Sequence, residues 1–454
     1  MDEPPQQAMG GGGGGQDRIG SDRRTQARCR HLRRRRRRTW DIGPRYWALL
    51  PEDLIRAVAW RVLACGDLLD YVRLRAVCTS WRSGADSPRG RGLADRRFHP
   101  RRWMMFPEGH RIYPGHPDLG GCARFLHLDT GALVRAHVPL LGDSYWAVDS
   151  IDGLLLLVRD PDPDYGGAVR LLHPFTGDFA ELPPLGTLLP HLGPQLHGCP
   201  PEYRIRKLAR IVSASVSFDA AGAMTVTLAL PEVGRAAFAT PLDQQWTLSS
   251  WEHEMGFPLS FQGKLYVLHT PFGEDVHQVL QINPPVQQDG VGGGRVLPPP
   301  ELIATVPEDK IPYPNLGLVE CGSEILVLGN DYSDLYGTQI FVYKLADLAL
   351  QRFVPIKSLG GNTLFMEQRN ISVSSKILHT FKGDNVVYFT GSRIVQYHLG
   401  SDSLSTAVDN CSLFGRAPGP SPLVLYVFSC CIRNPWSRGI VFRPDIEGCP
   451  WIKT

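Results

Sequence analysis

The sequence lacks the patterns that mark many enzyme and metal sites. It contains no G-x-S-x-G, no H-E-x-x-H and no phosphate-binding P-loop. Its ten cysteines and fourteen histidines are dispersed, without a C-x-x-C pair or the Cys/His spacing of a zinc site. We therefore expect no catalytic residue, no metal ion and no cofactor. The expected role is non-catalytic.

Long apolar runs are also missing. The longest near the C-terminus, residues 423–428, is far shorter than the ~20 residues that cross a bilayer, so no membrane segment is expected. No secretory signal is recognised either. We expect free thiols in a reducing compartment, and a nuclear and/or cytoplasmic location.

Basic residues are concentrated at the N-terminus. Residues 1–46 hold twelve arginines and five acids, a net charge of +7, which leaves −4 for the rest of a chain whose total is +3. The segment includes six consecutive glycines and the run Arg33, Arg34, Arg35, Arg36, Arg37 and Arg38. It cannot bury enough apolar surface to offset its ordering entropy, so disorder is expected.

The arginine run is a candidate nuclear-import signal or nucleic-acid patch, and a low-complexity tail without a selected role is the alternative. No aromatic residue interleaves with the arginines to stack on bases. Nucleic-acid binding is therefore disfavoured.

Residues 47–82 read as three short helices. Pro51 is expected at the first helical position, ahead of acidic residues in the first turn. Apolar residues at 55, 58, 59, 62 and 63 then define one face of a helix that reaches residue 63. A second helix is expected over 68–74, and a third is expected to carry Val77 and Trp81 on one side.

The sequences Leu50-Pro-Glu-Asp-Leu54 and Val77-Cys-Thr-Ser-Trp-Arg82 closely resemble the F-box, over residues 47–82. F-box proteins dock on the Skp adaptor of a cullin-RING ubiquitin ligase. The resemblance implies adaptor-binding or core roles for Leu50, Pro51, Leu54, Ile55, Val58, Val77 and Trp81. An ordinary helical hairpin at the edge of a domain is the alternative.

From residue 103, short apolar runs alternate with turn residues in six similar units. Gly131 and Gly177 stand where a tight hairpin needs a positive φ. Such small sheets cannot cover their own apolar faces, so the units are expected to stack around an axis as a β-propeller of six blades, with seven possible. Residues 423–428 are expected to close the first blade. A β-sandwich is the alternative.

The passages His173-Pro-Phe-Thr-Gly177, 358–365 and 387–390 look like the kelch-related β-propeller of a plant F-box family. That domain is the domain of unknown function 295 (KIB-type), and the resemblance covers roughly residues 103–430. An F-box ahead of this propeller is the family's usual arrangement.

The expected fold is therefore α+β multidomain, a short three-helix F-box followed by an all-β propeller. Its expected parts are a tail (1–46), the F-box (47–84), a solvated basic linker (85–102) and the propeller (103–445). Connections at 107–121, 160–167, 187–204 and 329–337 are candidate recognition loops.

The expected function is that of the substrate-recognition subunit of a Skp-cullin-F-box ubiquitin ligase. Its expected partners are a Skp-type adaptor, cullin through that adaptor, and a target protein of unknown identity. The alternatives are a stand-alone propeller interaction module, a propeller enzyme with a catalytic channel, and a chromatin or RNA binder that acts through the tail.

Overall fold

We describe a computed structural model of the chain. It describes residues 47–65, 68–106, 121–141, 145–159, 166–192, 198–256, 258–288, 294–308, 317–334, 337–378, 383–390, 393–407, 427, 430–431, 440–442 and 451–453. The basic tail with Arg33 to Arg38 and most of the expected loop at 107–121 lie outside these residues.

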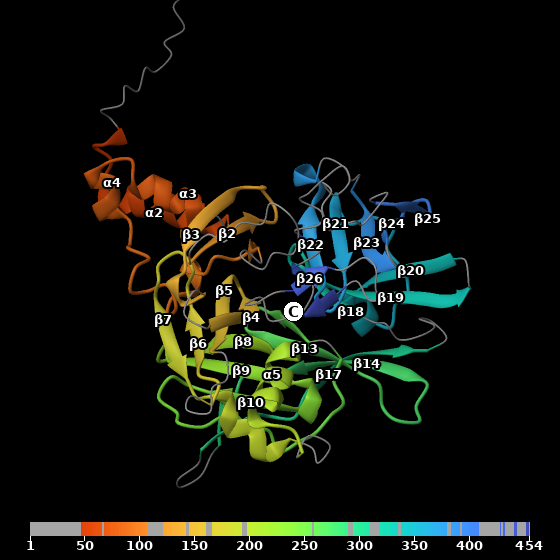
Figure 1. Cartoon of the computed structure of the whole chain (residues 1–454). Helices are drawn as coiled ribbons and strands as arrows, with labels where there is room; N and C mark the ends of the chain where they lie inside the picture. The colour runs from red at the N-terminus through yellow and green to blue at the C-terminus, as the bar shows by residue number, and fades with distance from the viewer. Residues whose placement is uncertain are drawn as a thin grey trace, which may run out of the picture.

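Three short helices form a helical unit beside the propeller (Figure 1): α2 (Glu52–Ala64), α3 (Leu68–Arg75) and α4 (Thr79–Gly84). The expected helices are confirmed to within a residue or two, with two corrections. Pro51 is the N-cap of α2, with φ −54° and ψ 146°, and not its first helical residue. Val77 precedes α4, because the backbone is still extended at Cys78, so Val77 and Trp81 do not share a helical face.

Six small sheets surround a common axis and make a six-bladed β-propeller (Figure 1). Blade one contains β1 (Trp103–Met105), β2 (Cys122–His127) and β3 (Leu133–His137), and blade two contains β4 (Tyr145–Ile151), β5 (Leu154–Arg159), β6 (Val169–Leu172) and β7 (Phe179–Leu182). Blade three contains β8 (Ser213–Phe218), β9 (Met224–Leu230), β10 (Arg235–Ala239) and β11 (Thr247–Leu248), and blade four contains β12 (Leu259–Phe261), β13 (Lys264–His269), β14 (Val276–Ile282) and β17 (Glu301–Pro307).

Blade five contains β18 (Gly317–Cys321), β19 (Glu324–Asp334) and β20 (Gly337–Lys344). Blade six contains β21 (Asn362–Met366), β22 (Ile371–Ser374), β23 (Asn385–Thr390), β24 (Arg393–His398) and β25 (Ser403–Thr406). Its order, β22-β21-β23-β24-β25, includes a parallel pairing of β21 with β23, whereas the strands of the other blades pair antiparallel. Two further strand pairs, β15 (Val286–Gln287) with β16 (Arg295–Val296) and β26 (Ile440–Phe442) with β27 (Trp451–Lys453), lie outside the six blades.

The expected hairpin turns are confirmed. Gly131 and Gly177 have φ values of 73° and 78°, the left-handed region that glycine tolerates. Gly153, between β4 and β5, combines a φ of 83° with a close approach to the linker, where an added Cβ would lie 1.9 Å from the Pro100 carbonyl oxygen. The turn at Gly153 therefore sets how closely the linker can pack on blade two.

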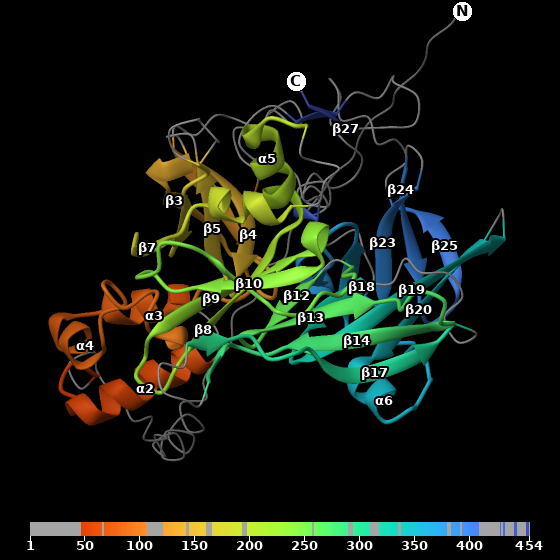
Figure 2. The same cartoon turned by 90° about the horizontal axis from the view of Figure 1, so that it is seen from below.

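Two expected loops contain regular structure. Residues 187–204 run through the 3-10 helix η3 (Leu185–His191) into α5 (Pro201–Ile211), and residues 329–337 belong largely to β19 and β20. A short helix, α6 (Leu345–Ala349), was also not expected. Figure 2 shows α5 on one side of the ring and the helical unit near the other.

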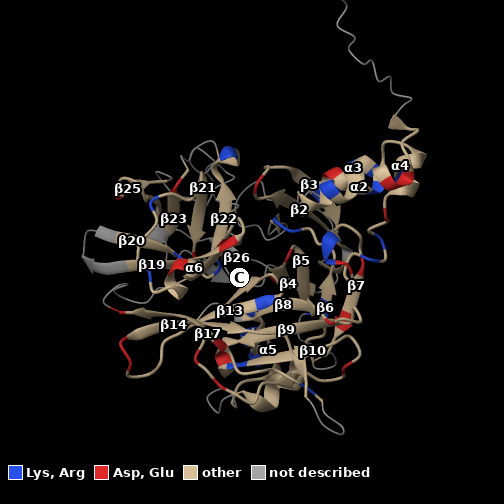
Figure 3. Ribbon diagram, turned by 180° about the vertical axis from the view of Figure 1, so that it is seen from behind, with Lys and Arg blue, Asp and Glu red and all other residues tan. Residues whose placement is uncertain are grey.

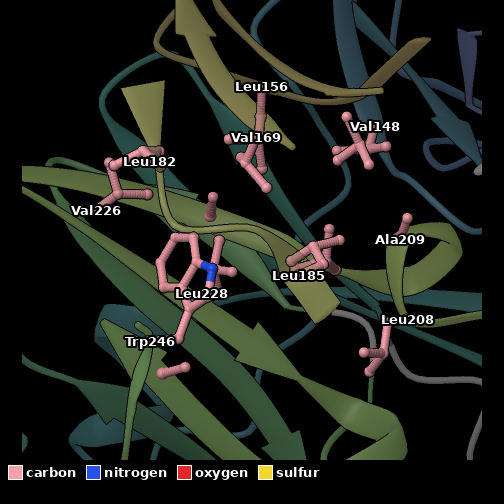
Figure 4. Close-up of a cluster of buried hydrophobic side chains, with 14 of the residues drawn as sticks. Val148, Leu156, Val169, Leu182, Leu185, Leu208, Ala209, Val226, Leu228 and Trp246 are labelled. Carbon is pink, nitrogen blue, oxygen red and sulfur yellow. The ribbon is translucent and has the colours of Figure 1, made fainter. Parts of the chain in front are cut away.

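Apolar side chains fill the spaces between neighbouring blades. Figure 4 shows one such cluster, where Leu156 and Val169 of blade two meet Val226 and Leu228 of blade three. Leu208 and Ala209 of α5 complete the cluster at the right of the view. Buried contacts of this kind between successive sheets hold the blades together.

Blades six and one meet through main-chain contacts. The Ser374 amide of blade six donates to the Leu128 carbonyl after β2, at 2.9 Å. The expected closing segment at 423–428 lies almost wholly outside the described residues. Its described neighbour Cys430 is helical and donates from its thiol to the Met105 carbonyl at 3.4 Å, so it meets blade one without extending the sheet as a strand.

Candidate functional site

The helical unit exposes an unusual amount of apolar surface for so small an element. Its exposed apolar side chains are Trp47, Leu49, Leu54, Val58, Val72 and Val77, each more than a third accessible. Leu54 and Val58 lie one turn apart on α2, with 48% and 38% of their surface accessible. Val77 is 63% accessible where the chain enters α4. Exposed apolar surface of this kind is typical of a protein interaction site.

The remaining expected adaptor-binding residues are less exposed or buried. Pro51 is exposed, while Leu50 and Trp81 are half-buried. The Trp81 indole N–H donates to the Trp47 carbonyl at 2.7 Å, which ties the segment before α2 to α4. Ile55 is buried against Gly84 of α4, so its side chain belongs to the helical core and is not available to a partner.

The core of the helical unit is completed by the linker, which corrects the expectation of a solvated connector. Phe98, at the end of the 3-10 helix η1 (Arg96–Phe98), is fully buried among the helices, 5.7 Å from the ring of Tyr71. The Arg97 guanidinium lies 3.9 Å from the centre of the Trp60 ring. The linker is thus part of the packed structure.

A histidine in blade two fixes the same segment to the propeller. His173 is fully buried, and its Nε2 lies 2.9 Å from the Phe98 carbonyl oxygen. Its Nδ1 accepts hydrogen bonds from the Phe175 and Thr176 amides at 3.2 and 3.1 Å, so Nε2 carries the proton and donates to Phe98. The position of the helical unit is therefore set by the propeller.

Ionisable groups at this junction have shifted pKa values. Burial and the nearby Asp86 carboxyl raise the pKa of Tyr71 to about 12, and the Tyr71 hydroxyl donates to the Asp86 carbonyl oxygen at 2.8 Å. Hydrogen bonds from Arg97 lower the pKa of Asp95. Tyr71 and Asp95 thus have hydrogen-bond partners within the fold, and their role is structural.

The second candidate site is the central channel, where the blades enclose a cavity of ≈ 170 Å³. Asp149 of β4 accepts a hydrogen bond from the Ala214 amide of β8 at 2.8 Å and also pairs with Arg369 of blade six. This carboxylate joins three blades at the axis.

Two other carboxyl groups line the channel. Burial raises the pKa of Glu320 on β18. Burial alone would also raise the pKa of Asp152, but contacts with His99 and the nearby arginines lower it. The described residues contain no group of three or more His, Cys, Asp or Glu side chains placed to hold a metal ion.

Fold and site together define a six-bladed β-propeller that carries a helical unit with an exposed apolar surface. The chain belongs to the KIB1-4 beta-propeller family, whose model matches residues 125–414. No curated protein matches the chain in a sequence search. Among the described residues, no helix has the length and apolar character needed to cross a membrane.

Proposed function

We propose that this protein is the non-catalytic substrate-recognition subunit of a Skp-cullin-F-box ubiquitin ligase. In this proposal the helical unit docks on the Skp-type adaptor and the propeller binds the protein to be ubiquitinated. The mechanism is proximity, because a target held near the charged conjugating enzyme has a raised effective concentration. A propeller that binds partners without a ligase is the competing function.

The observation that carries the proposal is the exposure of Leu54, Val58 and Val77 on a helical unit that resembles an F-box. Covering Leu54 and Val77 with a partner would contribute about 2 to 4 kcal/mol, because each buried apolar side chain contributes about 1.5 to 3 kcal/mol and both are already partly covered. Because Leu54 and Val77 are largely exposed, we expect their substitution to weaken binding more than it destabilises the fold.

The packed junction supports the second half of the proposal. A receptor must hold its target at a defined distance from the ligase, and Phe98 and His173 fix the helical unit to blade two. The propeller supplies the broad surface on which a target can be recognised, as propellers commonly do.

The first test is binding of the full chain to a purified Skp adaptor, measured by calorimetry. The variant Leu54→Ser/Val77→Ser is expected to weaken binding more than tenfold, since each lost contact is worth ~1 kcal/mol or more. Its melting temperature should stay within a few degrees of the wild-type value, because both residues are largely exposed.

The matched control is Leu133→Ser/Val286→Ser, which changes the same residue types outside the helical unit, at positions of 58% and 50% accessibility. It should bind the adaptor like the wild type. Failure of the folded wild-type chain to bind would refute the ligase role and leave the propeller as an interaction module. An equal loss in both variants would show that binding does not use the helical unit.

A further inference from the structure

We propose that a groove between the helical unit and blade two binds an acidic peptide segment that carries an apolar side chain. This junction groove has a volume of ≈ 430 Å³ and lies between α3, α4, the start of the linker and the turn after β6. The site is distinct from the exposed adaptor-docking residues, because Leu54, Val58 and Val77 do not line it. It does not depend on adaptor docking.

All charged residues that line the junction groove are basic. The lining contains Arg75, Arg82 and Arg89 and no aspartate or glutamate. Among the described residues, none of these three guanidinium groups has a carboxylate within ion-pair distance. Arg75 is instead held by the carbonyl oxygens of Ala85 and Arg82, at 3.2 and 3.5 Å.

Nearby acidic side chains are already engaged. Asp70 pairs with Arg73 at 2.9 Å, and Asp86 lies 3.7 Å from Arg91. Asp178 accepts hydrogen bonds from the amides of Gly90 and Gly92, at 3.0 and 2.8 Å. None of these three carboxylates lines the junction groove, and Figure 3 shows basic residues along the chain between α4 and the propeller.

The rest of the groove is apolar. Leu68 is buried, Phe175 is half-buried, and Val72 keeps 45% of its surface accessible at the edge. Apolar surface beside arginines that have no carboxylate partner suits a segment that offers carboxylates to the rim of the groove and one apolar side chain to its floor.

The charge of the groove decides which kind of segment it favours. Residues 1–46 carry a net charge of +7 and would be repelled by the three arginines. Charge complementarity favours an acidic occupant, and the occupant that we propose is an acidic segment of another protein.

The test uses the full chain and a fluorescein-labelled peptide of Glu and Asp residues around a central Leu-Leu pair, with anisotropy as the readout at physiological salt. Arg82→Gln/Arg89→Gln should weaken binding about tenfold, because two exposed ion pairs contribute ~0.2 to 1 kcal/mol each and their loss also lowers the local potential. The control Arg56→Gln/Arg61→Gln removes the same charge from α2, outside the groove, and should change binding less than about twofold.

A second peptide, with Ser-Ser in place of Leu-Leu, tests the apolar floor and should bind several-fold more weakly. Equal losses in the two arginine variants would mean that the peptide senses only the general basic charge, and would overturn the assignment. Unchanged binding in Arg82→Gln/Arg89→Gln, or equal binding of the two peptides, would overturn it as well. Arg82 and Arg89 are exposed, so their substitution should leave the fold intact. A melting temperature equal to that of the wild type would check this.

Discussion

The imidazole of His173 illustrates how one buried side chain positions two parts of the molecule. It links blade two to Phe98, and Phe98 in turn fills the core of the helical unit. The sequence His-Pro-Phe-Thr-Gly suggested only a family motif and a hairpin turn. Its structural role depends on a contact across 75 residues, for which the sequence gives no local signal.

This role makes stability depend on pH. Burial, together with the nearby His99, lowers the pKa of His173, although the Phe98 carbonyl and Asp178 act in the opposite direction. The unfolded chain takes up a proton near the ordinary value of about 6.5, and the folded chain resists it. The stabilisation is therefore complete above about pH 6.5 and declines as the pH falls below that value.

Urea unfolding between about pH 7.5 and pH 5.5 tests this prediction in the wild type and in His173→Asn. The asparagine oxygen can still accept at the Nδ1 position but does not titrate, so the variant should show a shallower loss of stability on acidification. It should also be about 1 to 2 kcal/mol less stable at neutral pH, since the donor to Phe98 is lost. His253 and His277, whose pKa values are also lowered, are shared by both proteins. If the unfolding free energy fell equally steeply with pH in the wild type and in His173→Asn, His173 would not be the source of the pH dependence.

Strands β4 and β8 and the segment before β22 are joined at the axis by Asp149 and Arg369. Asp149 is buried, and removing one partner of a buried pair leaves the other charge uncompensated. We expect Asp149→Ala to lower the unfolding free energy by about 3 kcal/mol or more.

A double-mutant cycle with Asp149→Ala and Arg369→Ala should give a coupling energy above ~1 kcal/mol. The exposed pair Lys344 and Glu324 within blade five, 2.9 Å apart, is the control and should give a much smaller coupling energy, because water screens an exposed pair. A coupling at the axis no larger than that of the control would show that the pair does not hold the blades together.

Most hairpins of the propeller could be predicted from the sequence, and most of the strands nearest the axis could not. Apolar runs such as 154–158 and the glycines at 131 and 177 carry a clear local pattern. By contrast, β8 reads Ser-Ala-Ser-Val-Ser-Phe, whose strict alternation predicts a strand with one polar, exposed face. Ser213 and Ser215 are nevertheless buried, because other blades surround the strand, and burial by such distant neighbours cannot be predicted from the alternation.

Helix α5 was missed for a related reason. Its start, Cys199-Pro-Pro-Glu202, resembles a loop, yet Pro201 occupies the first helical turn, where proline is tolerated. Ile205, Leu208 and Ala209 form its buried face. The pairing of Asp149 with Arg369 lay beyond prediction altogether, since 220 residues separate them.

The distribution of charge divides the molecule into two parts. Residues 1–102 contain 23 arginines and 11 acidic residues, a net charge of +12, so the remaining residues carry −9 of the total of +3. The basic part includes the helical unit, and the acidic part is the propeller. This division favours different partners at the two ends of the molecule.

The proposal that the helical unit docks the ligase adaptor while the propeller remains free for a target is tested most directly by amide hydrogen exchange. The full chain is measured with and without a saturating Skp adaptor. We expect slower exchange in residues 47–82, above all around Leu54 and Val77, and no change in the strands of the six blades. Protection confined to the propeller, or no protection in residues 47–82 when the adaptor is bound, would contradict it.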